Sequence, residues 1–173
     1  MDTISYDATT GSFFLRLRSS VYVLRILPGG EVVHIGFAPL VPDAPERLAA
    51  ARLDDYKDAN YVWDERARAY EYPAYGEFSH RESAFKAAFP KAPGALEAGE
   101  VVNLPVRDVR LRYHSHEVRT DALPAGAAIH RREARDPSPR PTLCLRLKDE
   151  AYAFFVTLFY RVTAECDLIE RWV

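Results

Sequence analysis

The stretch that decides the fold reads Thr142-Leu143-Cys144-Leu145-Arg146-Leu147-Lys148-Asp149, continues through residues 151–164, and closes on Cys166-Asp167-Leu168-Ile169-Glu170-Arg171-Trp172-Val173. These apolar and alternating runs are typical of successive β-strands. Strands usually end in turn residues such as Gly, Pro, Asn or Asp, and the last of these runs reaches Val173 without one. We therefore expect the chain to be the front portion of a larger protein.

Length and composition indicate one globular domain. A chain of 173 residues can bury about 70% of the surface that its unfolded form exposes. Apolar residues make up 48% of the chain and charged residues 28%, as in soluble proteins. The net charge of −2 does not favour nucleic acid or an anionic membrane. No apolar run reaches the length of about 18 residues that spans a bilayer, and the first residues lack the features of a signal peptide. We expect a cytoplasmic protein without nucleic-acid or membrane partners.

Two cysteines are present, Cys144 and Cys166. Both fall in strand patterns and neither belongs to a C-x-x-C pair, so we expect two reduced thiols in the core. A disulfide between them is the alternative.

Strand signals continue in the N-terminal part of the chain. Residues 13–18 alternate between apolar and charged, and residues 21–27 are rich in β-branched and aromatic side chains. Pro28-Gly29-Gly30 separates this second run from a third at residues 31–37. Proline presets φ and glycine accepts positive φ, so the spacing predicts a β-hairpin.

The middle of the chain is less regular. Residues 44–53 predict two helical turns, with Pro45 at the first helical position and Asp43 as the cap. Residues 54–105 show few periodic segments, and stretches of this kind are functional loops, partner-contacting arms or disordered segments.

Residues 109–116 predict a half-buried strand, with Val109, Leu111 and Tyr113 on one face and His114 and His116 on the other. Residues 152–160 are apolar on both faces and predict a central strand, with a hairpin turn at residues 147–151 before it. With at least six strands and little helix, the fold class is all-β: an antiparallel β-sandwich with long irregular loops.

Candidate catalytic and metal sites are few. His114 and His116, on one strand face, have a spacing that can chelate zinc, but no third ligand lies nearby, so we expect two solvated histidines and no metal. The acid pairs Asp54-Asp55 and Asp149-Glu150 lie in loops or turns without a partner for glycoside chemistry. No G-x-S-x-G motif or phosphate-binding loop occurs, so we predict no catalytic residue and no cofactor.

Two aromatic stretches stand out: Tyr61-Val62-Trp63-Asp64-Glu65-Arg66 and Tyr70-Glu71-Tyr72-Pro73-Ala74-Tyr75-Gly76. Rings mixed with Arg and acids suit sugar stacking with hydroxyl hydrogen bonding, and they equally suit a protein interface. Capping of the sandwich core by these rings is the remaining interpretation.

The order of several segments resembles that of a known family. These segments are Phe13-Phe14-Leu15, Val21-Tyr22-Val23-Leu24, Gly30-Glu31-Val32-Val33-His34-Ile35-Gly36-Phe37, Glu71-Tyr72-Pro73-Ala74-Tyr75-Gly76 with Arg81 and Ala84, Leu111-Arg112-Tyr113-His114-Ser115-His116, Leu123-Pro124-Ala125, Thr142-Leu143 with Leu147-Lys148-Asp149, Tyr160, and Asp167-Leu168-Ile169-Glu170-Arg171. Over nearly all of its length the chain resembles the N-terminal domain of glycoside hydrolase family 36 (GH36) α-galactosidases.

The resemblance implies the first part of a β-supersandwich at residues 1–173. In the family a (β/α)₈ barrel follows and carries the two catalytic aspartates of a retaining mechanism on α-galactosides; no position here matches them. Family enzymes are often tetramers in which supersandwich loops help to close the pocket of a neighbouring subunit. Arg81 matches the arginine of the family's Gly-x-Gly-Asp-Phe-Arg stretch, whereas Ser79 replaces its Asp and Phe78 its second Gly.

The first hypothesis is therefore a non-catalytic supersandwich segment of an α-galactosidase that acts in homo-oligomer assembly and pocket closure, with Trp63 and Arg81 as the substrate-contact candidates. The alternative is a free-standing carbohydrate-binding or protein-interaction sandwich. A third hypothesis is a small metal-dependent enzyme that uses His114 and His116.

Overall fold

The computed structural model describes residues 2–50, 69–74, 76, 83–88, 105–106, 109–121 and 138–173. Its elements are, in chain order, β1 (Ile4–Asp7), β2 (Ser12–Arg16), β3 (Ser20–Ile26), β4 (Val32–Pro39), α1 (Ala44–Ala50), β5 (Ala87–Ala88), β6 (Pro105–Val106), β7 (Leu111–Asp121), β8 (Arg140–Asp149), β9 (Phe155–Thr163), the 3₁₀ helix η3 (Ala164–Cys166) and β10 (Leu168–Trp172). The predictions for residues 51–68, 75, 77–82, 89–104, 107–108 and 122–137 lie outside the described residues.

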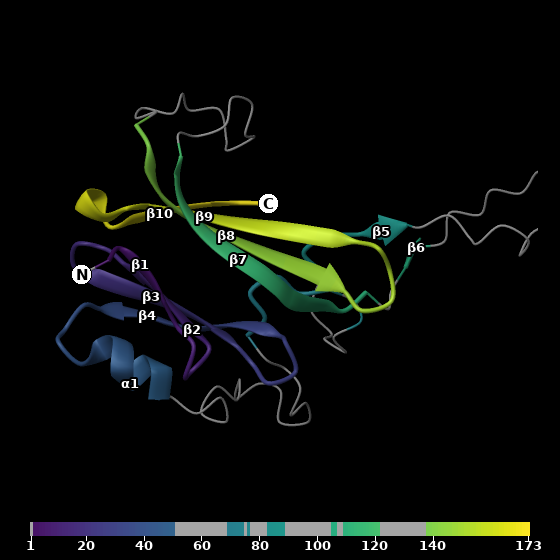
Figure 1. The fold of residues 1–173 in the computed structure, drawn as a ribbon, viewed down its shortest axis with the longest axis horizontal. Coiled ribbons are helices and arrows are strands. Elements are labelled where there is room, and N and C mark those ends of the chain that lie inside the picture. Colours follow the sequence, from purple (N-terminus) through teal and green to yellow (C-terminus); the bar gives the residue numbers. More distant parts are fainter. Residues whose placement is uncertain are drawn as a thin grey trace, which may run out of the picture.

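Two four-stranded sheets form the body of the molecule (Figure 1). The first has the order β1-β2-β3-β4 and the second the order β10-β9-β8-β7, while β5 and β6 form a small separate ribbon. All neighbouring strands in the two large sheets run antiparallel. The prediction of an all-β antiparallel sandwich with little helix is confirmed.

The predicted hairpin joins β3 and β4. Gly30 has φ of 82°, which glycine accepts without strain, and its N–H donates to the Leu27 carbonyl at 2.8 Å. The Gly30 carbonyl in turn accepts the Tyr113 N–H at 2.7 Å, so the tip of this hairpin is fixed to β7 in the other sheet. Strand β1, which no sequence pattern predicted, adds to the edge of β2.

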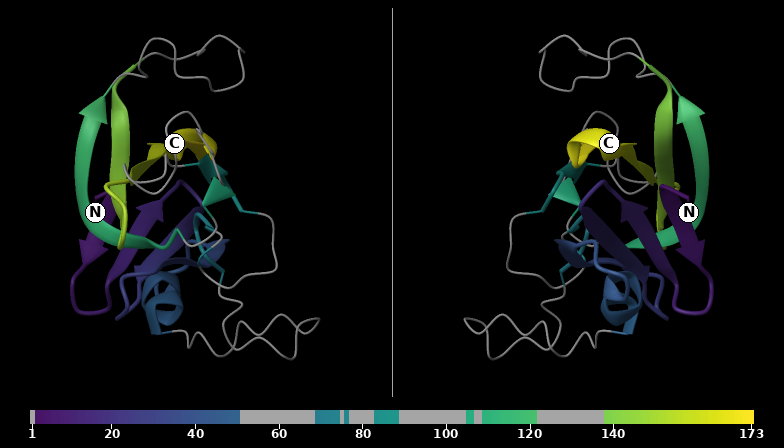
Figure 2. Two further views of the ribbon diagram at one scale, coloured as in Figure 1. Left: turned by 90° about the vertical axis from the view of Figure 1, so that its right-hand side faces the viewer. Right: turned by 90° about the vertical axis from the view of Figure 1, so that its left-hand side faces the viewer.

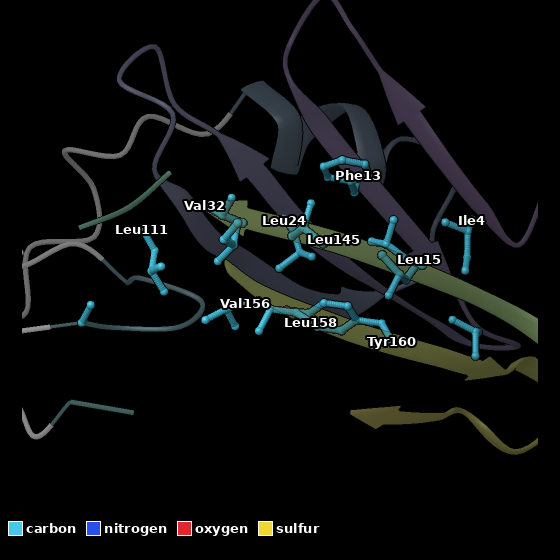
Figure 3. Packing of buried hydrophobic residues seen from close by; sticks show 14 of the residues in the cluster. Ile4, Phe13, Leu15, Leu24, Val32, Leu111, Leu145, Val156, Leu158 and Tyr160 are labelled. Carbon is cyan, nitrogen blue, oxygen red and sulfur yellow. The ribbon is translucent and has the colours of Figure 1, made fainter. Parts of the chain in front are cut away.

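The main core lies between the two sheets (Figure 3). From the first sheet, Phe13, Leu15 and Leu24 point into it, and each is fully buried. From the second sheet, Leu158 and Tyr160 of β9 meet them. Strand β9 lies between β10 and β8, which confirms the prediction that it is central. The turn before it differs in position, because β8 extends to Asp149 and the turn occupies residues 150–154.

A second, smaller core lies on the opposite face of the first sheet. Val21, Val23 and Ile35 are fully buried there, and they pack with Ala44 of α1. Helix α1 begins at Ala44, as predicted, and covers the face that turns away from β7–β10 (Figure 2). The first sheet is therefore apolar on both faces, which explains the dense β-branched pattern of β3 and β4.

Strands β4 and β10 are the edges of the two sheets on one side of the sandwich. Just before β10, Asp167 adopts φ of 50°, and its carboxylate accepts the N–H of Ser19 at 2.8 Å and the hydroxyls of Ser19 and Ser20 at 2.7 and 3.0 Å. These bonds fix the start of β10 to the start of β3. Among the described residues, β10 pairs only with β9.

Neither cysteine forms a disulfide, which confirms the reduced state. Cys144 is buried, but Cys166 is exposed at the end of η3, so the prediction of a second core thiol was wrong. The 3₁₀ turn interrupts the strand pattern there and brings Cys166 to the surface. Within the described part of the chain, no helix combines the length and the apolar character needed to cross a membrane.

Candidate functional site

The segment 69–74 crosses the edge strand β4. The Ala69 carbonyl accepts the His34 N–H at 2.8 Å, the Glu71 N–H donates to the Val32 carbonyl at 2.9 Å, and Tyr70 forms an isolated bridge with Val33. These backbone bonds extend the first sheet by one short piece of chain. They also direct the side chain of Glu71 to where β3, β9 and β10 meet.

Glu71 is a buried carboxylate with 5% of its surface exposed. The Tyr22 hydroxyl donates to its two oxygens at 3.0 and 2.9 Å, and the Tyr160 hydroxyl donates to Oε1 at 2.8 Å. Arg171 Nη1 lies 2.8 Å from the same Oε1, and the guanidinium also donates to the Glu71 carbonyl. We call Glu71, Tyr22, Tyr160 and Arg171 the Glu71 cluster. Because its members come from both sheets, the cluster links the first sheet to the second near their edge strands β4 and β10.

Burial and the charge of Glu71 keep the two phenols of the cluster protonated, so that both can donate hydrogen bonds. Burial raises the pKa of the Tyr22 phenol far above its usual range, and the charge of Glu71 adds to the effect. Burial, with the same carboxylate second, also raises the pKa of Tyr160. The Glu71 carboxylate accepts bonds from strands of both sheets and so ties them together. The arrangement therefore fixes structure.

A cleft of about 520 Å³ opens beside the cluster. Its lining residues come from the two facing sheets and are Leu17, Tyr22, His34, Phe37, Tyr160, Asp167, Leu168, Ile169 and Arg171. His34 Nδ1 is buried without a hydrogen-bond partner among the described residues. Burial lowers the pKa of His34, partly offset by Glu71. The His34 imidazole, two phenols and a half-exposed guanidinium thus give a mainly apolar cleft one polar wall.

Further hydrogen bonds hold the described residues that flank positions 77–82 in the sequence. Two residues after Glu71, the Pro73 carbonyl accepts the Ala84 N–H at 2.9 Å and the Ser83 hydroxyl at 3.3 Å. The Gly76 N–H donates to the Val109 carbonyl at 2.9 Å. The chain is thus fixed immediately before and after residues 77–82. Trp63 and Arg81, the predicted contact residues, both lie outside the described residues.

The prediction that His114 and His116 share one strand face was wrong. The pairing of β7 with β8 shifts between Tyr113 and Ser115, so Tyr113 opposes Leu147 and His116 opposes the core residue Leu145. A bulge of this kind adds one residue and reverses the alternation beyond it.

The contacts of the two rings agree with that shift. His116 packs on Tyr6 and Phe13 of the first sheet, with ring centroids 4.7 and 4.8 Å away, and its Nδ1 is 2.7 Å from the Tyr113 hydroxyl. His114 meets Phe155 on the outer face of the second sheet. The two rings cannot bind one ion together, and the described residues contain no group of three or more metal-ligating side chains.

Two buried carboxylates were missed as structural acceptors. Asp149 is 1% exposed and accepts the N–H groups of Arg110, Ala151 and Tyr152 at 2.7, 2.7 and 2.6 Å, so it organises the turn before β9. Glu71 stands in the sequence within the aromatic stretch 70–76, with no pattern that marks it as buried. The tyrosines Tyr22 and Tyr160, which lie in strand patterns, could have indicated a buried acceptor, because a buried phenol needs a hydrogen-bond partner.

No protein-family model and no curated protein matches the sequence. Similarity is found among solved structures of α-galactosidases, which share the fold of this chain. The galactosidase domain of the α-galactosidase–sucrose kinase AgaSK superposes with a TM-score of 0.67 and 20% identity, over 97% of this chain and 22% of its own.

The GH36 α-galactosidase AgaB from Geobacillus stearothermophilus gives a TM-score of 0.60 and 25% identity, over 99% of this chain and 22% of its own. A variant of AgaA from the same organism, solved with raffinose, gives a TM-score of 0.59 and 25% identity, over 92% of this chain and 21% of its own. The resemblance stated from the sequence is confirmed: the chain has the fold of the N-terminal portion of GH36 α-galactosidases. It spans about a fifth of the length of these structures.

Proposed function

We propose that residues 1–173 form the non-catalytic first part of the β-supersandwich of an α-galactosidase-like glycoside hydrolase. The observation that carries this proposal is the extent of the match: 92–99% of the chain superposes on α-galactosidases that are more than four times as long. The parent reaction is the retaining hydrolysis of terminal α-galactosides, and the catalytic aspartates belong to a barrel outside this chain. The proposed parent enzyme is a cytoplasmic homo-oligomer.

Within that enzyme the chain acts in subunit assembly and in closing the galactoside pocket of a neighbouring subunit. The Glu71 cluster and the bonds of Pro73 and Gly76 support this role, because they fix the described residues that flank positions 77–82 in the sequence. Binding residues are often carried on loops that a rigid scaffold positions. Trp63 and Arg81 are the proposed sugar contacts.

The test is kinetic and uses the longest product of the gene. Arg81→Ala and Trp63→Ala should each raise KM for p-nitrophenyl α-galactopyranoside by about tenfold and change kcat less, as expected for a lost ground-state contact. Arg18→Ala, on an exposed turn of the first sheet, is the matched control and should leave KM unchanged. Unchanged KM in both variants, or a fully active monomer, would contradict the role in pocket closure.

A further inference from the structure

The outer face of the second sheet carries a groove that the proposed function does not use. The side chains of Val156, Leu158 and Tyr160 enter the core, so the alternate residues of β9 point outward. These residues are Phe155, Thr157 and Phe159, and we call them the β9 outer row.

Two hollows meet along the β9 outer row. One of about 440 Å³ extends over β7 and β8 and is lined by Ser115, His116, Glu117, Arg119, Cys144 and Arg146 in addition to that row. The other, of about 680 Å³, extends toward the rings of Tyr72, Phe85 and Phe154 and the side chain of Val173. Because both hollows share the row, they form one recess that is polar at one end and aromatic at the other.

The ring faces of the β9 outer row are already occupied. The Arg146 guanidinium carbon lies 4.3 Å above the Phe155 ring centroid, and the His114 ring meets Phe155 edge-on at 5.6 Å. The Phe159 ring stacks on the Trp172 ring with centroids 5.1 Å apart, and the Arg119 guanidinium carbon lies 5.7 Å from the Phe159 centroid. Sugar recognition needs a free ring face, so these rings are poorly suited to it. They instead hold guanidinium groups in fixed positions.

Two cationic side chains of the groove have no carboxylate partner in the part of the chain that the structure describes. Arg119 pairs with Glu117 at 3.2 Å. By contrast, Arg146 and Lys148 have ring contacts to Phe155 and no carboxylate partner among the described residues. They are two residues apart on one face of β8, so their Cα atoms are separated by about 7 Å. Two adjacent cations on a strand face repel each other unless an anionic partner binds them.

An extended polypeptide with acidic residues at alternate positions matches this arrangement. Its side chains at i and i+2 point to the same side about 7 Å apart, the same repeat as on β8. Two such carboxylates can pair with Arg146 and Lys148, while an apolar side chain of the same segment enters the aromatic end of the recess. A polyanion without apolar groups would leave that end unused.

We propose that this groove, made of the β9 outer row with Arg146 and Lys148, is a docking surface for an acidic, extended polypeptide segment that carries at least one aromatic or aliphatic side chain. The proposal does not rest on the function proposed above. Aromatic side chains combined with arginine are the composition of energetically important protein interfaces.

The test uses fluorescence anisotropy with a labelled peptide of sequence Ser-Glu-Ser-Glu-Ser-Phe-Ser, in which the two acids and the ring share one face of an extended chain, and a second peptide in which lysine replaces each acid. The acidic peptide should bind the 173-residue chain saturably and the lysine peptide should not. Binding should weaken as NaCl is raised from about 0.02 to 0.3 M, because salt screens exposed ion pairs. The double variant Arg146→Ala/Lys148→Ala should raise Kd at least about tenfold.

The matched control is Arg18→Ala/Arg47→Ala, which removes the same charge from exposed sites outside the groove and should leave Kd unchanged. Thermal melts of both double variants verify folding. Absence of binding, equal loss in both double variants, or displacement of the peptide by raffinose would overturn the proposal. Equal affinity for a sulfated dextran that lacks apolar groups would also overturn it, since the aromatic end would then have no role.

Discussion

Replacing Glu71 by glutamine keeps the shape of the side chain and removes its charge. The Glu71 carboxylate accepts hydrogen bonds from Tyr22 and Tyr160 and pairs with Arg171 at distances of 2.8–3.0 Å. Hydrogen bonds to a charged group contribute about 1.5–3 kcal/mol and neutral ones about 0.5–1.5 kcal/mol. Each of the two phenol contacts should therefore lose about 1 kcal/mol in the glutamine variant.

The contact with Arg171 should lose less, because 38% of the arginine side chain is exposed and water screens the pair. The total expected loss is about 2–3 kcal/mol of the free energy of unfolding. In a chain of this size that corresponds to a fall in Tm of about 4–12 °C. The variant still folds, since domains of this kind are stable by about 5–15 kcal/mol.

Urea unfolding followed by far-UV circular dichroism measures the effect. Glu117→Gln is the control: this glutamate also pairs with an arginine, but both side chains are exposed, so the loss should stay below about 0.5 kcal/mol. Combining Glu71→Gln with Tyr160→Phe should give a loss smaller than the sum, because both changes remove the same contact. A loss below about 1 kcal/mol for Glu71→Gln, or strict additivity with Tyr160→Phe, would refute the structural role of the cluster.

Other regions give further expectations. Because the pKa values of Tyr22 and Tyr160 are raised in the folded chain, the unfolded chain releases these phenol protons at lower pH. Their contribution to the free energy of unfolding is complete below pH 10 and should fall above it by about 1.4 kcal/mol per pH unit for each tyrosine. Urea titrations at pH 9–11 check this, and a slope unchanged in Tyr22→Phe would contradict it. Gly30→Ala places a β-carbon on a residue with φ of 82° and 3.3 Å from the Arg112 β-carbon; a loss of about 1–2 kcal/mol is expected, and a neutral effect in a thermal melt would show that the turn relaxes. Cys166 should react with a thiol reagent in seconds in the native state, whereas buried Cys144 should react only after unfolding; mass spectrometry of the labelled peptides distinguishes them, and fast labelling of both would argue against the burial of Cys144.

The sheet architecture could be predicted from the sequence because it depends on local signals. Alternation in residues 13–18, the Pro28-Gly29-Gly30 turn and the apolar run before Tyr160 each point to one structure without tertiary information. Strand β1 was missed because Ile4–Asp7 is short, and its pairing with β2 is what defines it as a strand.

The candidate site was harder to predict, because it is built from residues far apart in the chain. Glu71 lies 49 residues from Tyr22 and 89 from Tyr160. No local pattern reveals that one carboxylate satisfies both phenols. The same limit explains the error at His116: alternation alone gives no sign of the bulge after Tyr113, which depends on the pairing with β8.

The measurement that distinguishes the proposed function from its alternatives most directly is hydrolysis of p-nitrophenyl α-galactopyranoside by the 173-residue chain and by the longest product of its gene, assayed side by side. An accessory supersandwich segment requires activity in the longer product and none in the short chain. Activity in the short chain would contradict a non-catalytic role. A gene that encodes nothing beyond Val173, with no activity, would instead favour a free-standing binding module.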